Sequence, residues 1–195
     1  MLFAIEEEIM SDVYCYLLGA GASCYSLPVS ANLPDKVEKF IPPKKGKSHI
    51  LRMIREMLDF KSDSKGTNIS EAVNYFSKTI KKRSIAFVIS DFLDDHFQDS
   101  LKLAKRRHDL IGIRIEDGRE GMLPDIGWVN FIDPETEEKR WINTSRKKVR
   151  KDYAKRFIEK RTQLTHFFNK AGIDNCIIET GKDYIKPLLM LFKNR

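Results

Sequence analysis

The stretch Ser84–Asp95, SIAFVISDFLDD, decides the fold class of this chain. Its core, Ile85–Ile89, is an unbroken apolar run in which four of the five residues are β-branched or aromatic. Such a run is typical of a strand buried on both faces, as in a parallel sheet covered by helices. Polar residues follow at once, and open α/β sheets bind ligands at the carboxyl ends of their central strands. Asp91 is therefore the first candidate site residue.

The elements on either side of this strand extend the α/β pattern. Before it, a helix is predicted to start at Asn68, which precedes Glu71 at the spacing of a capping box. After it, a helix is expected to begin near Asp94 or Asp95, which would cap it. Residues 109–115, DLIGIRI, are predicted to form the next buried strand. Strand, helix and strand at this spacing predict parallel βαβ construction.

The C-terminal part of the chain predicts a hairpin, a long helix and a last strand and helix. Residues 128–132 and 140–143 are predicted to form a hairpin at the sheet edge. The longest helix follows Ser145 and runs to about Ala171, and a short strand is expected over 175–180. The apolar residues of a terminal helix are expected to face inward: Ile185, Leu188, Leu189 and Phe192.

The composition is that of a globular protein in a reducing compartment. Of the 195 residues, 42% are hydrophobic and 32% charged, which argues against wholesale disorder. The three cysteines show no metal-ligand spacing, and their odd number suits a reducing environment. No apolar stretch reaches the roughly 18–20 residues of a membrane helix. A cytoplasmic protein without a membrane span is expected.

The formal net charge of +7 points to an acidic partner. Residues 139–161 hold eleven Lys or Arg against the acids Asp152 and Glu159. On a helix, five of these would make a broad positive face: Arg146, Lys147, Arg150, Lys151 and Lys155. Nucleic-acid phosphate could bind such a face through counterion release. However, a core stripe interrupts the basic residues, and no exposed aromatic platform or known nucleic-acid motif is evident. A solvated face, or one that meets an acidic protein partner, is therefore favoured, and nucleic acid is the alternative.

No arrangement of residues in the sequence indicates catalysis. The four histidines are scattered over different predicted elements and show no metal-ligand spacing. Neither a Ser/His/Asp nor a Cys/His arrangement is evident. We therefore expect a protein that is not an enzyme.

From about residue 35 to the C-terminus, the chain resembles domain-of-unknown-function family 58. The stretches that carry the resemblance include KVEKFIPPKKG, KGTNISEAV, SIAFVISDFLDD, KRRHDLIGIRI, MLPDIGWV, RWINTS and DYIKPLLMLF. The resemblance implies a von Willebrand factor A-like domain over 35–195, with a doubly wound, mainly parallel sheet and helices on both faces. Residues 1–34 form an atypical segment that does not resemble the opening strand and helix of this fold.

The resemblance also implies a metal-ion-dependent adhesion site at the carboxyl end of the sheet. In the wider fold three loops build it, and they supply an Asp-x-Ser-x-Ser motif, a threonine and an aspartate. Thr67 matches the second loop and Asp91 the third, whereas no Asp-x-Ser-x-Ser occurs in this sequence. Because Mg²⁺ takes about six oxygen ligands, two are too few to hold it tightly. No cofactor is expected unless a complete Mg²⁺ site forms. Otherwise Thr67 would help to cap a helix, and Asp91 would bind backbone N–H groups of its turn.

The family is commonly linked to MoxR-type AAA+ ATPases, in systems thought to assemble or activate other proteins. The resulting expectation is a non-catalytic protein–protein interaction module that works with such an ATPase. Its candidate contacts are the loops around Thr67, Asp91, Asp94 and Asp95, together with the basic residues of the long helix. The alternative is a nucleic-acid-binding protein that uses the basic helix 146–161.

Overall fold

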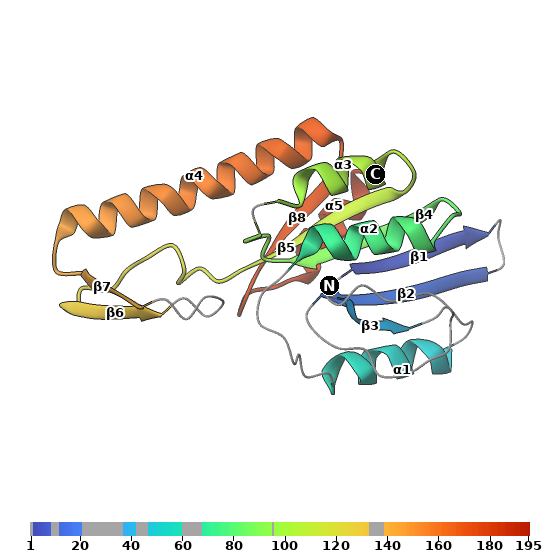
Figure 1. Ribbon diagram of the computed structural model, residues 1–195, viewed down its shortest axis with the longest axis horizontal. Helices are drawn as coiled ribbons and strands as arrows, with labels where there is room; N and C mark the ends of the chain where they lie inside the picture. Colours follow the sequence, from blue (N-terminus) through green and yellow to red (C-terminus); the bar gives the residue numbers. More distant parts are fainter. Residues whose placement is uncertain are drawn as a thin grey trace. The chain divides into compact units, whose positions relative to one another are not determined.

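The computed structural model describes residues 2–8, 12–20, 37–41, 47–59, 68–94, 96–132 and 139–195. These residues form a mixed α/β structure (Figure 1). The chain divides into two compact units, Met1–Ile113 and Arg114–Arg195. The expected domain boundary between residues 34 and 35 lies outside the described residues.

Six strands form the main sheet, in the order β3-β2-β1-β4-β5-β8. In that order their bounds are Val37–Ile41, Asp12–Ala20, Leu2–Glu8, Ser84–Ser90, Asp109–Glu116 and Asp174–Glu179. β4 and β5 are neighbours and neither lies at an edge, which confirms the prediction for these two apolar runs. β5 is buried on both faces, whereas β4 has one fully buried face, formed by Ser84, Ala86 and Val88, and one half-buried face.

Two helices complete the core of the first unit. α2 (Ile69–Thr79) packs against β2 and against α3 (Gln98–Lys105), which connects β4 to β5. Asn68 caps α2 as predicted, because its side chain accepts a hydrogen bond of 2.9 Å from the backbone N–H of Glu71. The fully buried side chains of this core come from α2, α3, β4 and β5, and the largest are Phe76, Leu101, Leu110 and Ile111.

The prediction of a mainly parallel sheet is wrong for the N-terminal strands. β1 pairs antiparallel with both β2 and β4, and β2 pairs antiparallel with β3. β1 therefore occupies the place beside β4, with Leu2 opposite Val88, although the pattern of residues 1–34 predicts no opening strand. Short connections explain the direction, since β1 and β2 are separated by only three residues, enough for a hairpin but not for a parallel crossover.

The first helix, α1 (Lys47–Leu58), follows β3 in the first unit. Leu51 and Ile54, which belong to its apolar stripe, are exposed.

The second unit contains the long helix and the hairpin. β6 (Trp128–Ile132) and β7 (Lys139–Asn143) pair antiparallel in a separate two-stranded sheet, so the predicted hairpin is confirmed but its place at the edge of the main sheet is wrong. α4 (Lys147–Ala171) follows directly and ends at Gly172, whose φ of 63° is the left-handed conformation that glycine adopts at a helix end. None of the helices in the described ranges combines the length and apolar character that a bilayer crossing requires.

The terminal helix, α5 (Ile185–Lys193), lies against β8. Its predicted orientation is wrong for three of four residues, because Ile185, Leu189 and Phe192 are exposed and Leu188 is half-buried. Only Leu191 of this helix is fully buried. The helix is apolar on nearly all sides, so the sequence pattern does not define which side faces the sheet.

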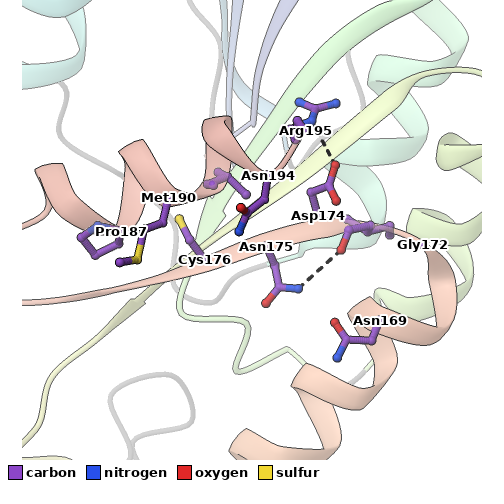
Figure 2. A pocket seen from close by; sticks show the side chains of 11 residues that line it. Asn169, Gly172, Asp174, Asn175, Cys176, Pro187, Met190, Asn194 and Arg195 are labelled. Atoms are coloured by element: carbon purple, nitrogen blue, oxygen red, sulfur yellow. Dashed lines mark hydrogen bonds and ion pairs between the residues drawn. The ribbon is translucent and has the colours of Figure 1, made fainter.

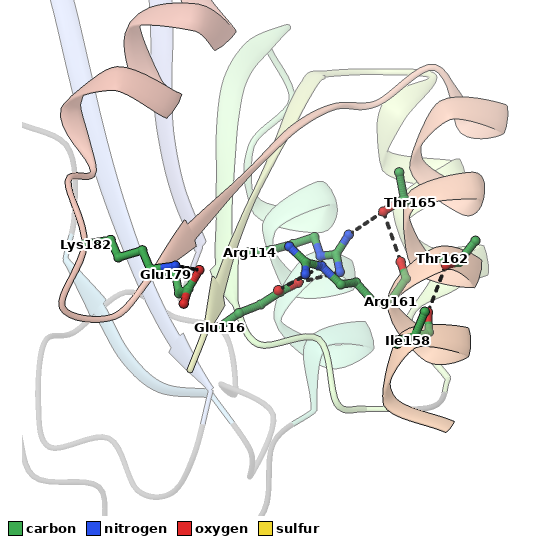
Figure 3. A network of polar contacts seen from close by, with 8 residues as sticks. All are labelled: Arg114, Glu116, Ile158, Arg161, Thr162, Thr165, Glu179 and Lys182. Atoms are coloured by element: carbon green, nitrogen blue, oxygen red, sulfur yellow. Dashed lines mark hydrogen bonds and ion pairs between the residues drawn. The ribbon is translucent and has the colours of Figure 1, made fainter. Parts of the chain in front are cut away.

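A buried arginine links the end of β5 to α4 within the second unit (Figure 3). Arg114 has a side chain only 2% exposed and donates to Glu116 Oε1 at 2.6 Å and to Thr165 Oγ1 at 2.7 Å. Arg161 of α4 pairs with the other oxygen of Glu116 at 3.1 Å. Burial lowers the pKa of Arg114, while the charge of Glu116 opposes that effect. The carboxylate thus compensates a charge that would be costly to bury alone.

Candidate functional site

The loop that follows β4 is fixed by an unusual backbone conformation. Phe92 has a φ of 57°, and among the described residues it is the non-glycine residue with a positive φ. Its side chain is buried and its ring lies 5.4 Å from that of Phe97. The hydroxyl of Ser90 accepts a hydrogen bond of 3.1 Å from the N–H of Phe92. A bulky residue in this conformation costs about 1–3 kcal/mol, and such strain is concentrated at binding and catalytic sites.

Asp94 joins this loop to the beginning of α2. Its Oδ2 accepts a hydrogen bond of 2.9 Å from the backbone N–H of Ile69, and its Oδ1 accepts one of 3.1 Å from the N–H of His96. The N–H of Ile69 is one of the groups at a helix start that the helix itself leaves without a partner. Asp94 therefore caps α2, a helix earlier in the chain.

This arrangement corrects the prediction that Asp94 or Asp95 caps the following helix. α3 begins at Gln98, with Phe97 at its N-cap position and no side-chain cap. Residues between Ser90 and Phe97 form the loop instead, because burial of both Phe92 and Phe97 anchors it at two points. Asp95 lies outside the described residues.

A second hydrogen bond ties the same two segments together. The hydroxyl of Ser70 donates to the carbonyl oxygen of His96 at 2.7 Å. With the bond from Ile69 to Asp94, it connects the first turn of α2 to the loop at two places. The loop is thereby braced at residues 94 and 96, while the side chains of Asp91, Leu93 and His96 are exposed.

Asp91 takes part in the turn rather than in a cluster of ligands. Its Oδ1 accepts a hydrogen bond of 3.3 Å from the N–H of Leu93 and one of 3.2 Å from the hydroxyl of Ser90. The bond to Leu93 agrees with the alternative expectation for Asp91, in which its carboxylate binds backbone N–H groups of its own turn. Thr67, the other residue matched to a metal loop, lies outside the described residues.

The described residues at this edge of the sheet do not fit a Mg²⁺ site. Both oxygens of Asp94 accept backbone hydrogen bonds. Among the described residues of the loop, this leaves Asp91 as the exposed carboxylate that could bind a cation. In the part of the chain that the structure describes, no group of three or more His, Cys, Asp or Glu residues could hold a metal ion. One carboxylate is too few for a cation that takes about six oxygen ligands.

The direction of β1 adds a geometric reason. In a doubly wound sheet, the loops after the first and fourth strands meet at the same edge. Here Leu2 pairs with Val88 and Glu6 with Ser84, so β1 runs away from the edge at which β4 ends. The carboxyl end of β1 therefore lies opposite to Asp91, and it brings no ligand to this loop.

The basic residues proposed for partner binding lie in the second unit, and they have different surroundings. Arg150 is half-buried, pairs with Asp125 Oδ2 at 2.8 Å and donates to the carbonyl oxygen of Thr144 at 2.5 Å. Arg150 therefore stabilises the start of α4. Arg146, Lys147 and Lys151 are exposed and remain available to a partner.

Thr144 shows why α4 starts where it does. This residue is fully buried, and its hydroxyl donates to the carbonyl oxygen of Gly127 at 2.9 Å and accepts from the N–H of Ile126 at 3.2 Å. Gly127 has a φ of 86°, a conformation that favours glycine at this turn. The end of β7 is thus joined to the start of β6, and α4 begins from a fixed point.

Two exposed tryptophans are not among the predicted site residues. Trp128 on β6 and Trp141 on β7 are each 65% exposed. The alternation of residue types along the two predicted strands contains the signal, since Trp128 and Asn130 fall on one face and Val129 and Phe131 on the other. The expected absence of an aromatic platform is therefore wrong.

A pocket of about 540 Å³ opens in the second unit (Figure 2). Its lining comes from the end of α4, from β8 and from α5, and includes Cys176, Asn175 and Met190. Burial raises the pKa of the Cys176 thiol, which favours the unreactive protonated form. Asp174, the carboxylate among the lining residues, pairs with Arg195 at 3.0 Å. The described lining of this pocket therefore offers no unpaired carboxylate that could act as a base toward the thiol of Cys176.

These features define a mixed α/β protein in which a braced loop follows a central strand. The chain belongs to the family described as protein of unknown function DUF58, which matches residues 29–163. No solved structure matches the chain.

Relatives with similar sequences occur in mycobacteria. Uncharacterized protein MAV169 of Mycobacterium avium is 29% identical over 129 residues, which cover 66% of this chain and 76% of that protein. Uncharacterized protein Mb1516 of Mycobacterium bovis and uncharacterized protein Rv1480 of Mycobacterium tuberculosis are each 23% identical over 158 residues, which cover 80% of this chain. The chain spans about half the length of these two relatives, since the match covers 50% of each.

Proposed function

We propose that this chain is a non-catalytic protein-binding module, and that its partner docks on the loop Ser90–Phe97. The observation that carries the proposal is the pair of hydrogen bonds that hold this loop to α2, from the N–H of Ile69 to Asp94 and from the hydroxyl of Ser70 to the carbonyl oxygen of His96. A loop that is fixed before binding loses less conformational freedom when a partner arrives.

The exposed residues of the loop suit a protein partner. Leu93 is 60% exposed although the loop has a buried anchor on each side of it, Phe92 and Phe97. Asp91 and His96 flank it with polar side chains that are also exposed. An apolar side chain surrounded by polar groups is the usual composition of a small protein contact. The backbone hydrogen bonds accepted by Asp91 and Asp94 support a role in shaping the loop rather than in moving protons.

The partner in this proposal is a MoxR-type AAA+ ATPase, and its support is the family membership alone, an associational argument. A cytoplasmic location belongs to the same proposal.

We also propose the finer fold assignment, a doubly wound von Willebrand A-like sheet. In its favour, the order β3-β2-β1-β4-β5-β8 follows the 3-2-1-4-5-6 order of doubly wound sheets. The antiparallel direction of β1, β2 and β3 departs from that arrangement.

A pair of matched double variants tests the binding site. Asp91→Ala with Leu93→Ala removes two exposed side chains of the loop and leaves His96 in place. Asp99→Ala with Leu103→Ala removes the same two residue types from the surface of α3, where Leu103 is 55% exposed. Binding of each variant to the purified MoxR-type ATPase of the same organism is measured by biolayer interferometry.

We expect the loop variant to bind at least tenfold more weakly and the α3 variant to bind as the wild type does. Thermal melts of both variants confirm that each is folded. Equal affinities for the loop variant and the wild type would refute the proposed site. No binding of the wild type to the ATPase would refute the proposed partner.

A further inference from the structure

Both tryptophans of the chain lie on one face of the β6–β7 hairpin. Trp128 pairs with Asn143 and Asn130 pairs with Trp141 across the two strands. Because side chains alternate between the faces of a strand, these four residues share a face. Trp128 and Trp141 are diagonal neighbours on it, a spacing of about 7–8 Å that large aromatic side chains can bridge.

The opposite face of the hairpin is the one used for packing. Val129 pairs with Ile142 on that face, and both are half-buried, as is Phe131. The tryptophan face is therefore not needed for the core of the second unit. Two indoles at 65% exposure on a single ribbon leave a large apolar surface in contact with water, and such patches mark binding sites.

Exposed basic residues adjoin this face. Lys139 lies on it, two residues before Trp141 on β7. Asn143, the cross-strand partner of Trp128, precedes Lys147 by four residues, so the chain allows at most roughly 14 Å between them. Lys148 and Lys151 follow on α4, and both are exposed.

The position of these lysines at the start of α4 does not stabilise the helix. The first turn of α4 contains no acidic residue, although the partial positive charge of a helix N-terminus favours acids. Asp125, which could compensate this charge, is paired with Arg150. The positive charge beside the tryptophan face is therefore complementary to an anionic partner.

We propose that the tryptophan face (Trp128, Asn130, Trp141 and Asn143) binds single-stranded nucleic acid, with Lys147, Lys148 and Lys151 contacting its phosphates. Bases stack on exposed aromatic rings whatever their identity, because every base has a flat π-face. The two asparagines between the rings are half-buried; Oδ1 of Asn130 is buried, and Oδ1 of Asn143 accepts a hydrogen bond of 3.0 Å from the N–H of Ser145. The indoles and the lysines therefore carry the recognition, because flat rings next to positive charges match the alternating bases and phosphates of a single strand.

The difference in charge between the two ends of the hairpin sets how the nucleic acid lies on it in this proposal. The sequence between Ile132 and Lys139 holds four acids and no basic residue, a composition unfavourable for phosphates. The opposite end leads into the basic start of α4. The phosphates are therefore placed beside Lys147 and Lys151. This activity is separate from the docking loop after β4 and does not depend on it.

Tryptophan fluorescence gives a direct test, because both indoles of the chain lie on the proposed surface. The full chain is titrated with a twelve-nucleotide oligo(dT) at 50 mM and 200 mM salt. We expect stacking to quench the emission, and binding to weaken as salt rises. Contacts to three phosphates would give a slope of about −2 for log K against log salt concentration.

Variants separate stacking from charge, with binding followed by the anisotropy of a labelled oligonucleotide. We expect Trp128→Ala with Trp141→Ala to weaken binding at least tenfold, and Trp→Phe at both positions to retain most of it. Lys147→Glu with Lys151→Glu should also weaken binding at least tenfold. Lys186→Glu with Lys193→Glu, the same charge change on α5, should have no more than a twofold to threefold effect.

Three results would overturn the proposal. One is an oligonucleotide that leaves the emission unchanged at 50 mM salt. Another is equal binding of oligo(dT) and poly-glutamate, with no loss in the tryptophan variant, which would show only attraction of a polyanion. The third is a blue shift of the emission with phosphatidylserine vesicles but not with oligo(dT), which would assign the face to an anionic membrane surface.

Discussion

Asp94 accepts a hydrogen bond of 2.9 Å from the backbone N–H of Ile69, a residue 25 positions earlier in the chain. The carboxylate thereby does two things at once. It satisfies a donor at the start of α2, and it fixes the loop that leaves β4. Stability of the first unit and the shape of the candidate binding loop therefore depend on the same side chain.

Replacing Asp94 by alanine is expected to lower the free energy of unfolding by about 1–2 kcal/mol, the usual cost of losing a helix cap. Asp94→Asn keeps an oxygen acceptor and should lose less. Asp99→Ala is the matched control, since Asp99 is an exposed aspartate that pairs with Lys102 on the surface of α3. Urea unfolding gives the comparison. An Asp94→Ala variant no less stable than the Asp99→Ala variant would show that the cap does not contribute.

His108 is expected to make the chain less stable in acid. Its ring is 2% exposed, lies 4.5 Å from the ring of Phe76, and has no hydrogen-bond partner on either nitrogen. Burial lowers the pKa of His108, and the charge of Arg107 lowers it further. The unfolded chain then binds a proton, near its ordinary pKa of about 6.5, that the folded chain resists.

The stability contributed by neutral His108 is therefore complete above about pH 6.5 and is lost as pH falls toward the lowered pKa, by at most about 1.4 kcal/mol per pH unit. Unfolding free energies of the wild type and of His108→Leu between pH 7.5 and 5 measure it. As pH falls, the unfolding free energy of the wild type should decrease more than that of His108→Leu. A difference that stays constant over this range would contradict the assignment.

Two arginines bind Glu116, and their removal should lower the free energy of unfolding by different amounts because only Arg114 is buried. Arg114→Ala leaves the partly buried Glu116 with one partner, opens a cavity, and should cost about 3–5 kcal/mol. Arg161 has a side chain 46% exposed, so Arg161→Ala should cost no more than about 1 kcal/mol. Arg114→Met, which fills the space without a charge, should fall between them. Guanidinium unfolding of the three variants tests this order, and equal losses for Arg114→Ala and Arg161→Ala would disprove it.

Magnesium is expected to leave the melting temperature unchanged within about 1 °C. A specific ligand at a hundredfold excess over its Kd adds about 2.7 kcal/mol, and a single exposed carboxylate at Asp91 cannot hold Mg²⁺ that tightly. Thermal melts with and without 5 mM Mg²⁺ provide the measurement. A rise of several degrees that disappears in Asp91→Ala would mean that a complete metal site exists.

The sequence predicted those elements whose signal is local. The apolar runs of β4 and β5, the cap at Asn68 and the glycine end of α4 are each defined by a few consecutive residues, and each is confirmed. Asp94 was assigned to the loop correctly but to the wrong helix, because a cap supplied from another segment leaves no spacing pattern.

Other features depend on packing between distant segments. The direction of β1 beside β4 cannot be derived from the composition of either strand. Arg114 lies inside an apolar strand, and its burial depends on Glu116 together with Thr165, 51 residues away. Local alternation places Trp128 and Trp141 on one face of the hairpin, but it does not reveal that the hairpin is separate from the main sheet.

Hydrogen–deuterium exchange on the complex tests the central proposal most directly. The chain is exchanged alone and with the purified MoxR-type ATPase, and peptides covering the whole sequence are compared. The proposed docking site predicts that slower exchange on binding is concentrated in residues 90–97 and the first turn of α2, which the loop contacts through Asp94 and Ser70. Slower exchange confined to another region, such as residues 139–151, or no change at a saturating concentration of the ATPase, would contradict it.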